Sequence, residues 1–295
     1  MASQYLKGLR RYHLGWSIPV VLFGVVVVAV LLGLWSIGQS RLRHDAKFEL
    51  RADDIHLIPL QPSWIREDVL QSVVKQHNLE ELFLDDDNLT KQIADAFTLH
   101  SWILGVELVE KRPTGVQVRV NYRKPVAMVE VKFNERPHVL PIDAMGTVLP
   151  PSDFNRDDIS NYLRIASDHL RPSGNVGDPW GDDKVAGAAK LAGLFDGVAW
   201  KEMGLYRIEV TLNPRDSKVV YYLVLKEYPE IRILWGSEPG QETVDEQIAP
   251  EKLAELKAFY RANKTLQISS EPTEIDLRSR EGVKVIPLKK DEEGL

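Results

Sequence analysis

Apolar residues along residues 48–100 follow first a strand period and then a helix period. The stretch "FELRADDIHLI", 48–58, alternates as a β-strand does and ends at two prolines. The next apolar residues fall on one face of a helix for which Ser63 is the expected N-cap: Ile65, Val69, Leu70, Val73 and Val74. The four-residue spacing of Leu89, Ile93 and Phe97 predicts a second, shorter helix.

Alternating valines predict two strands after these helices. The stretch "ILGVELVEKR", 103–112, is followed by a turn at 113–115 and by valines at 116, 118 and 120. The resulting order, β-α-α-β-β over residues 48–122, predicts a small α+β module with its helices on one face of a sheet.

Strand patterns dominate residues 123–288, which we expect to form a mixed β-domain with flanking helices. The stretch 138–150 reads as two strands joined through Asp143–Gly146. Residues 151–183 are rich in Pro, Gly, Asp and Ser, and they predict an inserted surface segment with one helical run near 157–169. A helix is expected over 182–195.

The remaining pattern predicts two hairpins, a strand and a helix. "LYRIEVTL" and "KVVYYLVL" form the first hairpin, with inward residues expected at Tyr206, Ile208, Val210 and Leu212. "IRILWG" is a further strand, and a helix from Pro250 carries Leu253, Leu256 and Phe259 or Tyr260. "EIDLRSREGVKVIPL", 274–288, reads as the last hairpin, before a disordered acidic tail at 289–295.

A long apolar segment near the start predicts a membrane span. Residues 14–40 contain no charged residue. The apolar centre from Trp16 to Ile37, 22 residues long, would reach roughly 33 Å as a helix, enough for a bilayer core of about 30 Å. We therefore expect one transmembrane helix over 16–38. The alternative is a cleaved signal peptide, for which Ser36-Ile37-Gly38 offers a small-residue site, but the apolar region is long for one.

Charge does not fix the orientation of that span. Lys7, Arg10 and Arg11 precede it, while four basic residues follow it by position 51, so the positive-inside rule gives no decision. Because only about 15 residues precede the span and about 250 follow, we expect a cytoplasmic tail at 1–15 and extracytoplasmic C-terminal domains. The expected location is the cytoplasmic (cell inner) membrane, as a single-pass protein.

Composition narrows the classes of function. The chain has 295 residues, of which 44% are hydrophobic, and it contains no cysteine, so thiolate metal sites and thiol nucleophiles are excluded. Residues 1–47 carry six Lys or Arg against one acid. The net charge of −6 therefore leaves −11 for residues 48–295. A nucleic-acid-binding face is not expected on so acidic a region.

No motif for catalysis or metal binding stands out. The seven histidines lack a short metal spacing, and Asp85–Asp87 lack the ligand pattern of a calcium loop, so we assign these acids to a helix N-terminus. Neither a nucleophile elbow nor a phosphate or dinucleotide loop is present. We expect no enzyme, with no catalytic, cofactor-binding or metal-binding residues.

Four stretches, in this order, resemble the FtsQ/DivIB family of bacterial cell-division proteins. Residues 83–131 resemble the family's second POTRA helix, its strand pair and the passage into its β-domain. "VLPIDAMGTVLP" is similar to its "LVD-x-x-G-x-VF" hairpin, and 233–260 to its strand, Gly turn and penultimate helix. "EIDLRSREGVKVIP" is similar to its closing hairpin, "x-D-L-R-Y-x-x-G-x-A-V".

The resemblance implies a divergent member of this family: a membrane span, a POTRA domain at 48–122, and a β-domain at 123–288 with 151–183 inserted. It implies a scaffold of the divisome in septum formation, with partners similar to the small bitopic proteins FtsB and FtsL and with the septal wall synthesis machinery. These partners would add a strand to the last hairpin. The expected partner-binding residues are Asp276, Leu277, Arg278, Ser279, Gly282, Val283, Lys284, Val285 and Ile286, with Tyr260 on the neighbouring helix.

Two other functions stay open from the sequence. A POTRA-containing protein of another envelope system, such as secretion, would share the first module, although no repeated strand series of a transporter barrel follows it. A membrane-anchored envelope enzyme would need a site assembled from residues distant in sequence.

Overall fold

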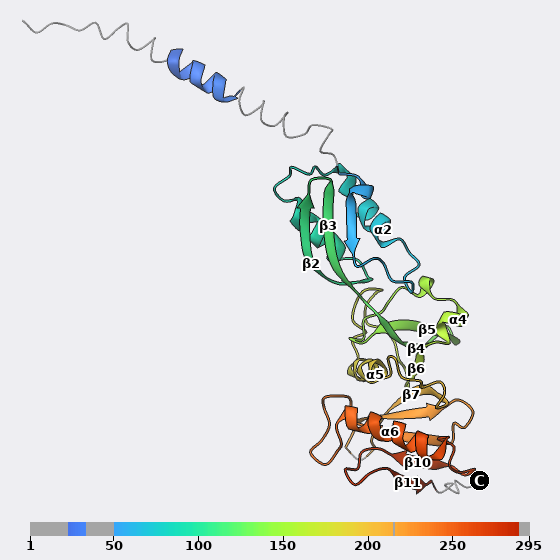
Figure 1. Ribbon diagram of the computed structural model, residues 1–295. Helices are drawn as coiled ribbons and strands as arrows, with labels where there is room; N and C mark the ends of the chain where they lie inside the picture. The colour runs from blue at the N-terminus through green and yellow to red at the C-terminus, as the bar shows by residue number, and fades with distance from the viewer. Residues whose placement is uncertain (1–22, 34–49, 215, 289–295) are drawn as a thin grey trace, which may run out of the picture.

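The computed structural model describes residues 23–33, 50–214 and 216–288. Residues 23–33 form a helix whose side chains are largely exposed, inside the predicted span of 16–38 (Figure 1). The rest of that span, the predicted tail at 1–15 and the acidic tail at 289–295 lie outside the described residues. Within the described ranges, no helix has the length and apolar character needed to cross a bilayer.

The first sheet has three strands in the order β1-β3-β2. Strand β1 pairs with β3 in parallel, and β2 pairs with β3 antiparallel. The elements follow the predicted order β-α-α-β-β, which is confirmed: β1 Ile55–Ile58, α2 Val69–Gln76, α3 Leu89–Thr98, β2 Ile103–Arg112 and β3 Gly115–Tyr122. Short 3₁₀ helices at Ala52–Asp54 and Leu79–Glu81 precede β1 and follow α2.

The start of this module differs from the prediction in two places. Ala52–Asp54 form a 3₁₀ helix, so the strand expected from residue 48 begins only at Ile55. Helix α2 begins after Asp68, whose carboxylate accepts a hydrogen bond from the Gln71 amide, and not at Ser63. The prediction for α3 is confirmed, since Leu89, Ile93 and Phe97 are fully buried.

The second sheet has eight strands in the order β11-β10-β9-β8-β7-β6-β4-β5. Its strands are β4 Pro125–Phe133, β5 Arg136–Asp143, β6 Leu163–Ala166, β7 Leu205–Leu212, β8 Val219–Leu225, β9 Ile231–Gly236, β10 Thr273–Asp276 and β11 Lys284–Pro287. The helical segments among them are η4 Pro151–Asp153, α4 Arg156–Ile159, α5 Asp183–Gly193 and α6 Ala249–Asn263. The α+β class is therefore confirmed.

Parallel and antiparallel pairs both occur in this sheet. Strand β6 is parallel to both of its neighbours, and β9 is parallel to β10. Helix α5 lies between β6 and β7 in the chain, and α6 between β9 and β10, as parallel connections require. Buried residues of both helices share one core with the sheet, including Ala188 and Leu256.

The segment 151–183 is more than the surface insertion we expected. Its residues Leu163–Ala166 form β6, which lies between β4 and β7 inside the sheet. Leu170 and Trp180 of the same segment are buried. The helical run expected near 157–169 is limited to α4.

The predicted hairpin of β7 and β8 is confirmed, but half of its inward residues are wrong. Ile208 and Val210 are buried, whereas Tyr206 is half-buried and Leu212 is 51% exposed. The register shifts between Leu205 and Arg207, as at a β-bulge, so the alternation changes phase there and Leu205 is buried instead of Tyr206.

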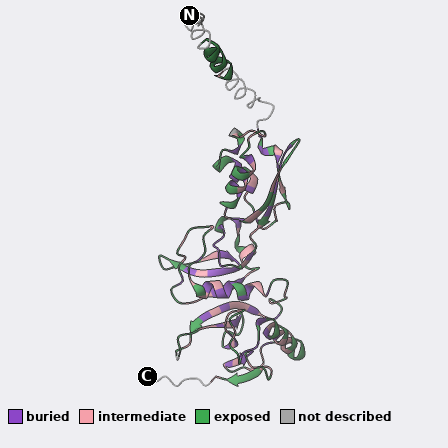
Figure 2. Cartoon of the chain, turned by 90° about the vertical axis from the view of Figure 1, so that its left-hand side faces the viewer, coloured by how far each residue is buried: buried purple, intermediate pink, exposed green. Residues whose placement is uncertain are grey.

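Two separate cores account for the two parts seen along the chain in Figures 1 and 2. A short stretch of the second part reaches the first core, where Leu149 is buried and Phe154 packs beside it. Between these residues, the buried carboxylate of Asp153 accepts hydrogen bonds from the Arg66 amide and the Trp102 indole, at 3.1 and 3.0 Å. This contact ties the start of the β-domain to the first module.

Candidate functional site

Strand β11 forms one edge of the eight-stranded sheet and pairs only with β10. All four of its residues are exposed, with Val285 at 46% and Ile286 at 42% (the strand beside the C-terminus in Figure 2). The sequence prediction of a last hairpin is confirmed, and no later strand of the described chain covers it. An edge of this kind offers backbone groups to another strand.

The hydrogen-bond phase decides which backbone groups of β11 are free. The Leu288 amide donates to the Pro272 carbonyl at 2.9 Å, so the bonded pairs of the hairpin recur at every second residue from there. These pairs are Glu274–Ile286 and Asp276–Lys284, while Thr273–Pro287 and Ile275–Val285 are the non-bonded ones. The N–H and C=O groups of Val285 therefore point away from β10.

Bonds on the other side of β10 agree with this phase. The Thr273 amide donates to Glu230 and the Leu277 amide to Leu234, both next to or in β9. Residues with odd numbers in β10 thus bond to β9, and those with even numbers bond to β11.

Prolines restrict pairing at the opposite edge strand, β5. The amide of Asp143 and the carbonyl of Pro141 bond to Thr147 and Leu149, so odd-numbered residues of β5 face outward. Two of those outward positions, Pro137 and Pro141, are prolines and have no N–H to offer. Val139, between these two prolines, keeps an outward N–H, so β5 has a donor flanked by proline on both sides, whereas the outward donor of β11, at Val285, has a proline on one side, at Pro287.

An ion pair between the buried Asp276 and the exposed Arg278 fixes the end of β10. Arg278 donates from its side chain to both carboxylate oxygens of Asp276, at 3.0 and 2.8 Å, and from its amide at 2.9 Å. Burial alone would raise the pKa of Asp276, but these bonds outweigh it and hold that pKa below its usual value. They also raise the pKa of Arg278. Leu277, between them, is fully buried.

The residues after β10 are held by the loop before α6. The Gln247 backbone amide donates to the Arg278 carbonyl at 2.9 Å, and the Gln247 side chain donates to the Ser279 carbonyl. The adjacent Glu246 and Ser279 form an isolated antiparallel bridge. Gly282, with φ at +105°, completes the turn into Val283, which packs partly against the core.

A buried pair of charges, Lys252 and Glu246, lies near this hairpin and was not predicted from the sequence. The Lys252 ammonium lies 2.5 Å from Glu246 and 5.3 Å from the centre of the Trp235 ring. Burial opposes the ionised carboxylate, but bonds from Lys252 and Ser237 hold the pKa of Glu246 below its usual value. Glu246 lies in a loop and Lys252 in a helix, and no sequence pattern indicates that two such residues form an ion pair. Their contact could be seen only in the folded structure.

The predicted partner-binding residues are not all at one place. Asp276, Leu277, Arg278 and Ser279 form the end of β10 and its turn, and Gly282 to Ile286 form the return and the edge itself. Tyr260 lies on α6, and its hydroxyl donates to the Glu202 carbonyl before β7. That bond links Tyr260 to another part of the domain than the β10–β11 hairpin.

A polar hollow of about 420 Å³ lies beside the hairpin, lined in part by Asp276, Arg278 and Lys284. Neither there nor elsewhere in the described chain are three or more His, Asp or Glu residues placed to bind a metal ion. Comparison with known proteins finds neither a matching family model nor a matching curated protein.

Proposed function

We propose that this protein is a non-enzymatic scaffold that binds a partner by β-strand addition at β11. The observation that carries the proposal is the outward N–H and C=O pair of Val285 on an exposed edge strand. A partner strand would hydrogen-bond to these groups and extend the sheet of eight strands to nine.

Side chains on the two faces of β11 would give such a partner its specificity. Val283 and Val285 lie on the face of the core, and Lys284 and Ile286 lie on the other. Exposed apolar residues would contact alternate side chains of the added strand. Lys284 and Pro287 would limit pairing between copies of the chain itself.

The resemblance to the FtsQ/DivIB family supports a place for this scaffold in cell division. In that role the edge would bind small bitopic proteins similar to FtsB and FtsL and link them to septal wall synthesis. The module of residues 55–122, with its β-α-α-β-β order, would be the POTRA domain. The apolar segment at 16–38 would anchor the protein in the cytoplasmic membrane, with its domains outside the cytoplasm.

A pull-down from native membranes tests this function. The tagged full-length protein is compared with Val285→Asp, which places a charge on the edge, and with Leu212→Asp as a matched control. Leu212 is similarly exposed, at 51%, but lies on an internal strand. Small single-span proteins and wall synthases should be captured by the wild type and the control, and lost with Val285→Asp.

Other captured proteins would change the function. Capture of secretion components in place of division proteins would indicate a POTRA-containing protein of another envelope system. Capture that is equal for all three proteins would remove β11 as the binding edge. A hydrolase activity lost on substitution of one polar residue, in a variant that still folds, would contradict a non-enzymatic scaffold.

A further inference from the structure

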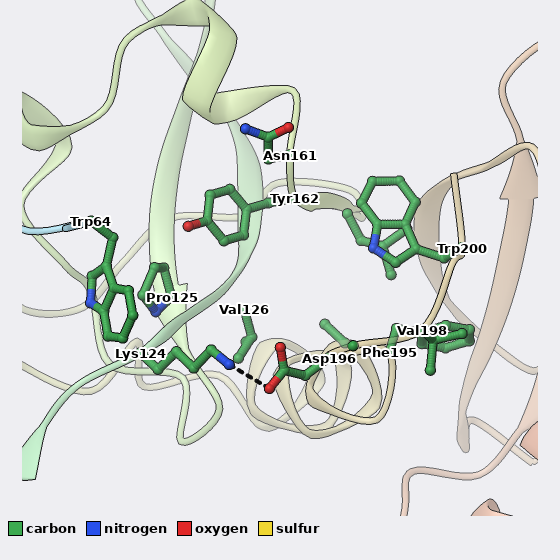
Figure 3. A pocket seen from close by; sticks show the side chains of 13 residues that line it. Trp64, Lys124, Pro125, Val126, Asn161, Tyr162, Phe195, Asp196, Val198 and Trp200 are labelled. Atoms are coloured by element: carbon green, nitrogen blue, oxygen red, sulfur yellow. Dashed lines mark hydrogen bonds and ion pairs between the residues drawn. The ribbon is translucent and has the colours of Figure 1, made fainter. Parts of the chain in front are cut away.

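A cavity of about 260 Å³ lies where the first module meets the β-domain (Figure 3). Its four aromatic side chains come from three separate segments: Trp64 precedes α2, Tyr162 precedes β6, and Phe195 and Trp200 follow α5. The side chains of Lys124 and Asp196 form an ion pair across it, marked by the dashed line in Figure 3. Aromatic walls with a few polar groups are typical of small-molecule sites.

Three of these rings, those of Trp64, Tyr162 and Trp200, contact a residue that does not line the cavity. The Trp64 indole donates to the Arg123 carbonyl at 3.2 Å, and Tyr162 packs edge-on against Phe154. The Lys201 ammonium lies over the Trp200 ring, 5.6 Å from the ring centre, and also donates a hydrogen bond to the Asn161 side chain. The rings are thus positioned before any ligand arrives, which lowers the entropy cost of binding.

The polar groups have unused hydrogen-bonding capacity. The Tyr162 hydroxyl makes no hydrogen bond within the described ranges, and burial, aided by Asp158 and Asp196, raises its pKa, so it stays a donor. Lys124 uses one of its three N–H donors on Asp196, whose carboxylate keeps further acceptor sites.

The charge of the lining indicates an uncharged ligand. Among the described residues that line the cavity, Lys124 and Asp196 are the charged ones, and their charges cancel. A ligand that suits this site has hydroxyl groups for the ion pair and a C–H face for the aromatic rings. We infer that the cavity binds a pyranose residue of a neutral sugar or glycan.

Saturation-transfer difference NMR on the full-length protein in detergent tests this inference. The probes are methyl β-glucoside, maltotetraose and chitotetraose at millimolar concentration. Ring protons of at least one probe should receive saturation from the protein. Tighter binding of a tetrasaccharide than of the methyl glycoside would indicate a glycan chain, and equal binding would indicate a single sugar.

Variants connect the signal to the cavity. Trp200→Leu should weaken binding about tenfold, the size expected for one aromatic contact. Asp196→Asn, at an exposed position where the fold should tolerate the change, should weaken binding as well. Tyr228→Leu, at a partly exposed tyrosine between β8 and β9, is the matched control and should bind as the wild type does.

Two results would overturn the inference: no saturation of any probe by the wild type, or equal saturation with Trp200→Leu and Asp196→Asn in folded protein. The site is independent of β11. Loss of sugar binding should leave capture through Val285 unchanged, so failure of one proposal is distinguishable from failure of the other.

Discussion

The Lys252 ammonium lies 2.5 Å from the Glu246 carboxylate, and neither side chain is more than 6% exposed. Removal of one member of a buried pair leaves an uncompensated charge, which costs about 3–5 kcal/mol. We predict a loss of this order in the free energy of unfolding of Lys252→Met, measured by urea denaturation. The double variant Lys252→Met/Glu246→Gln should recover part of the loss. A Lys252→Met protein as stable as the wild type would contradict the importance of the pair.

Gly236 lies against the same pair, in a conformation with φ at +92°. A Cβ there would come within 2.1 Å of the Glu246 carboxylate and 2.7 Å of the Arg278 side chain. Gly236→Ala should therefore lower the free energy of unfolding by more than about 1 kcal/mol. Gly240→Ala is the matched control, because Gly240 also has positive φ, at +85°, but open space around it. Equal losses for the two variants would show that crowding at Gly236 has no effect.

Asp153 joins the β-domain to the first module through the Arg66 amide and the Trp102 indole. Asp153→Ala would leave these donors without their acceptor, and unsatisfied buried groups cost about 1–3 kcal/mol each. We predict a lower midpoint of thermal unfolding for Asp153→Ala, while Asp157→Ala, at an exposed position nearby, should change it little. Similar midpoints for both variants would contradict a structural role of Asp153.

His100 should make stability depend on pH. Burial lowers its pKa below 6.5, against the opposing effects of Glu67 and Asp153, while His77 adds to the lowering. The unfolded chain therefore takes up a proton at His100 before the folded protein does. This stabilising contribution is present above the unfolded pKa of about 6.5 and is lost as pH falls below it.

The measurement is the free energy of unfolding at pH 7.5 and pH 5.5. In the wild type, His100 Nδ1 accepts a hydrogen bond from the Trp102 amide at 3.3 Å. His100→Asn keeps a side-chain acceptor for that amide, but the asparagine cannot titrate. The wild type should lose more stability than this variant between the two pH values. An equal loss would exclude His100 as the source.

The sequence predicts elements best where one period repeats without interruption. Helix α3 was predicted correctly because its apolar residues, Leu89, Ile93 and Phe97, recur at one helical spacing and form a single buried stripe. The helix from Pro250 and the last hairpin were predicted for the same reason. Strand β6 was missed because four residues among prolines, glycines and acids are too few to show a period.

The chemistry of the site was less predictable than its strands. The position of the edge followed from the alternation of residues 274–288, but its hydrogen-bond phase depends on the contact between Leu288 and Pro272, which no pattern encodes. Tyr206 was assigned inward because a β-bulge leaves no mark in the sequence. The predicted role of Tyr260 came from the resemblance, and its bond to Glu202 was not foreseen.

A pair of proline variants tests strand addition at β11 most directly. Val285→Pro removes an N–H that points away from the sheet, so the protein should keep its thermal stability and lose partner capture. Ile286→Pro removes a donor that bonds to β10, so it should destabilise the hairpin itself. Capture from native membranes by the full-length Val285→Pro protein is the measurement. Folded Val285→Pro that captures nothing supports the account, and folded Val285→Pro that captures as the wild type does contradicts it.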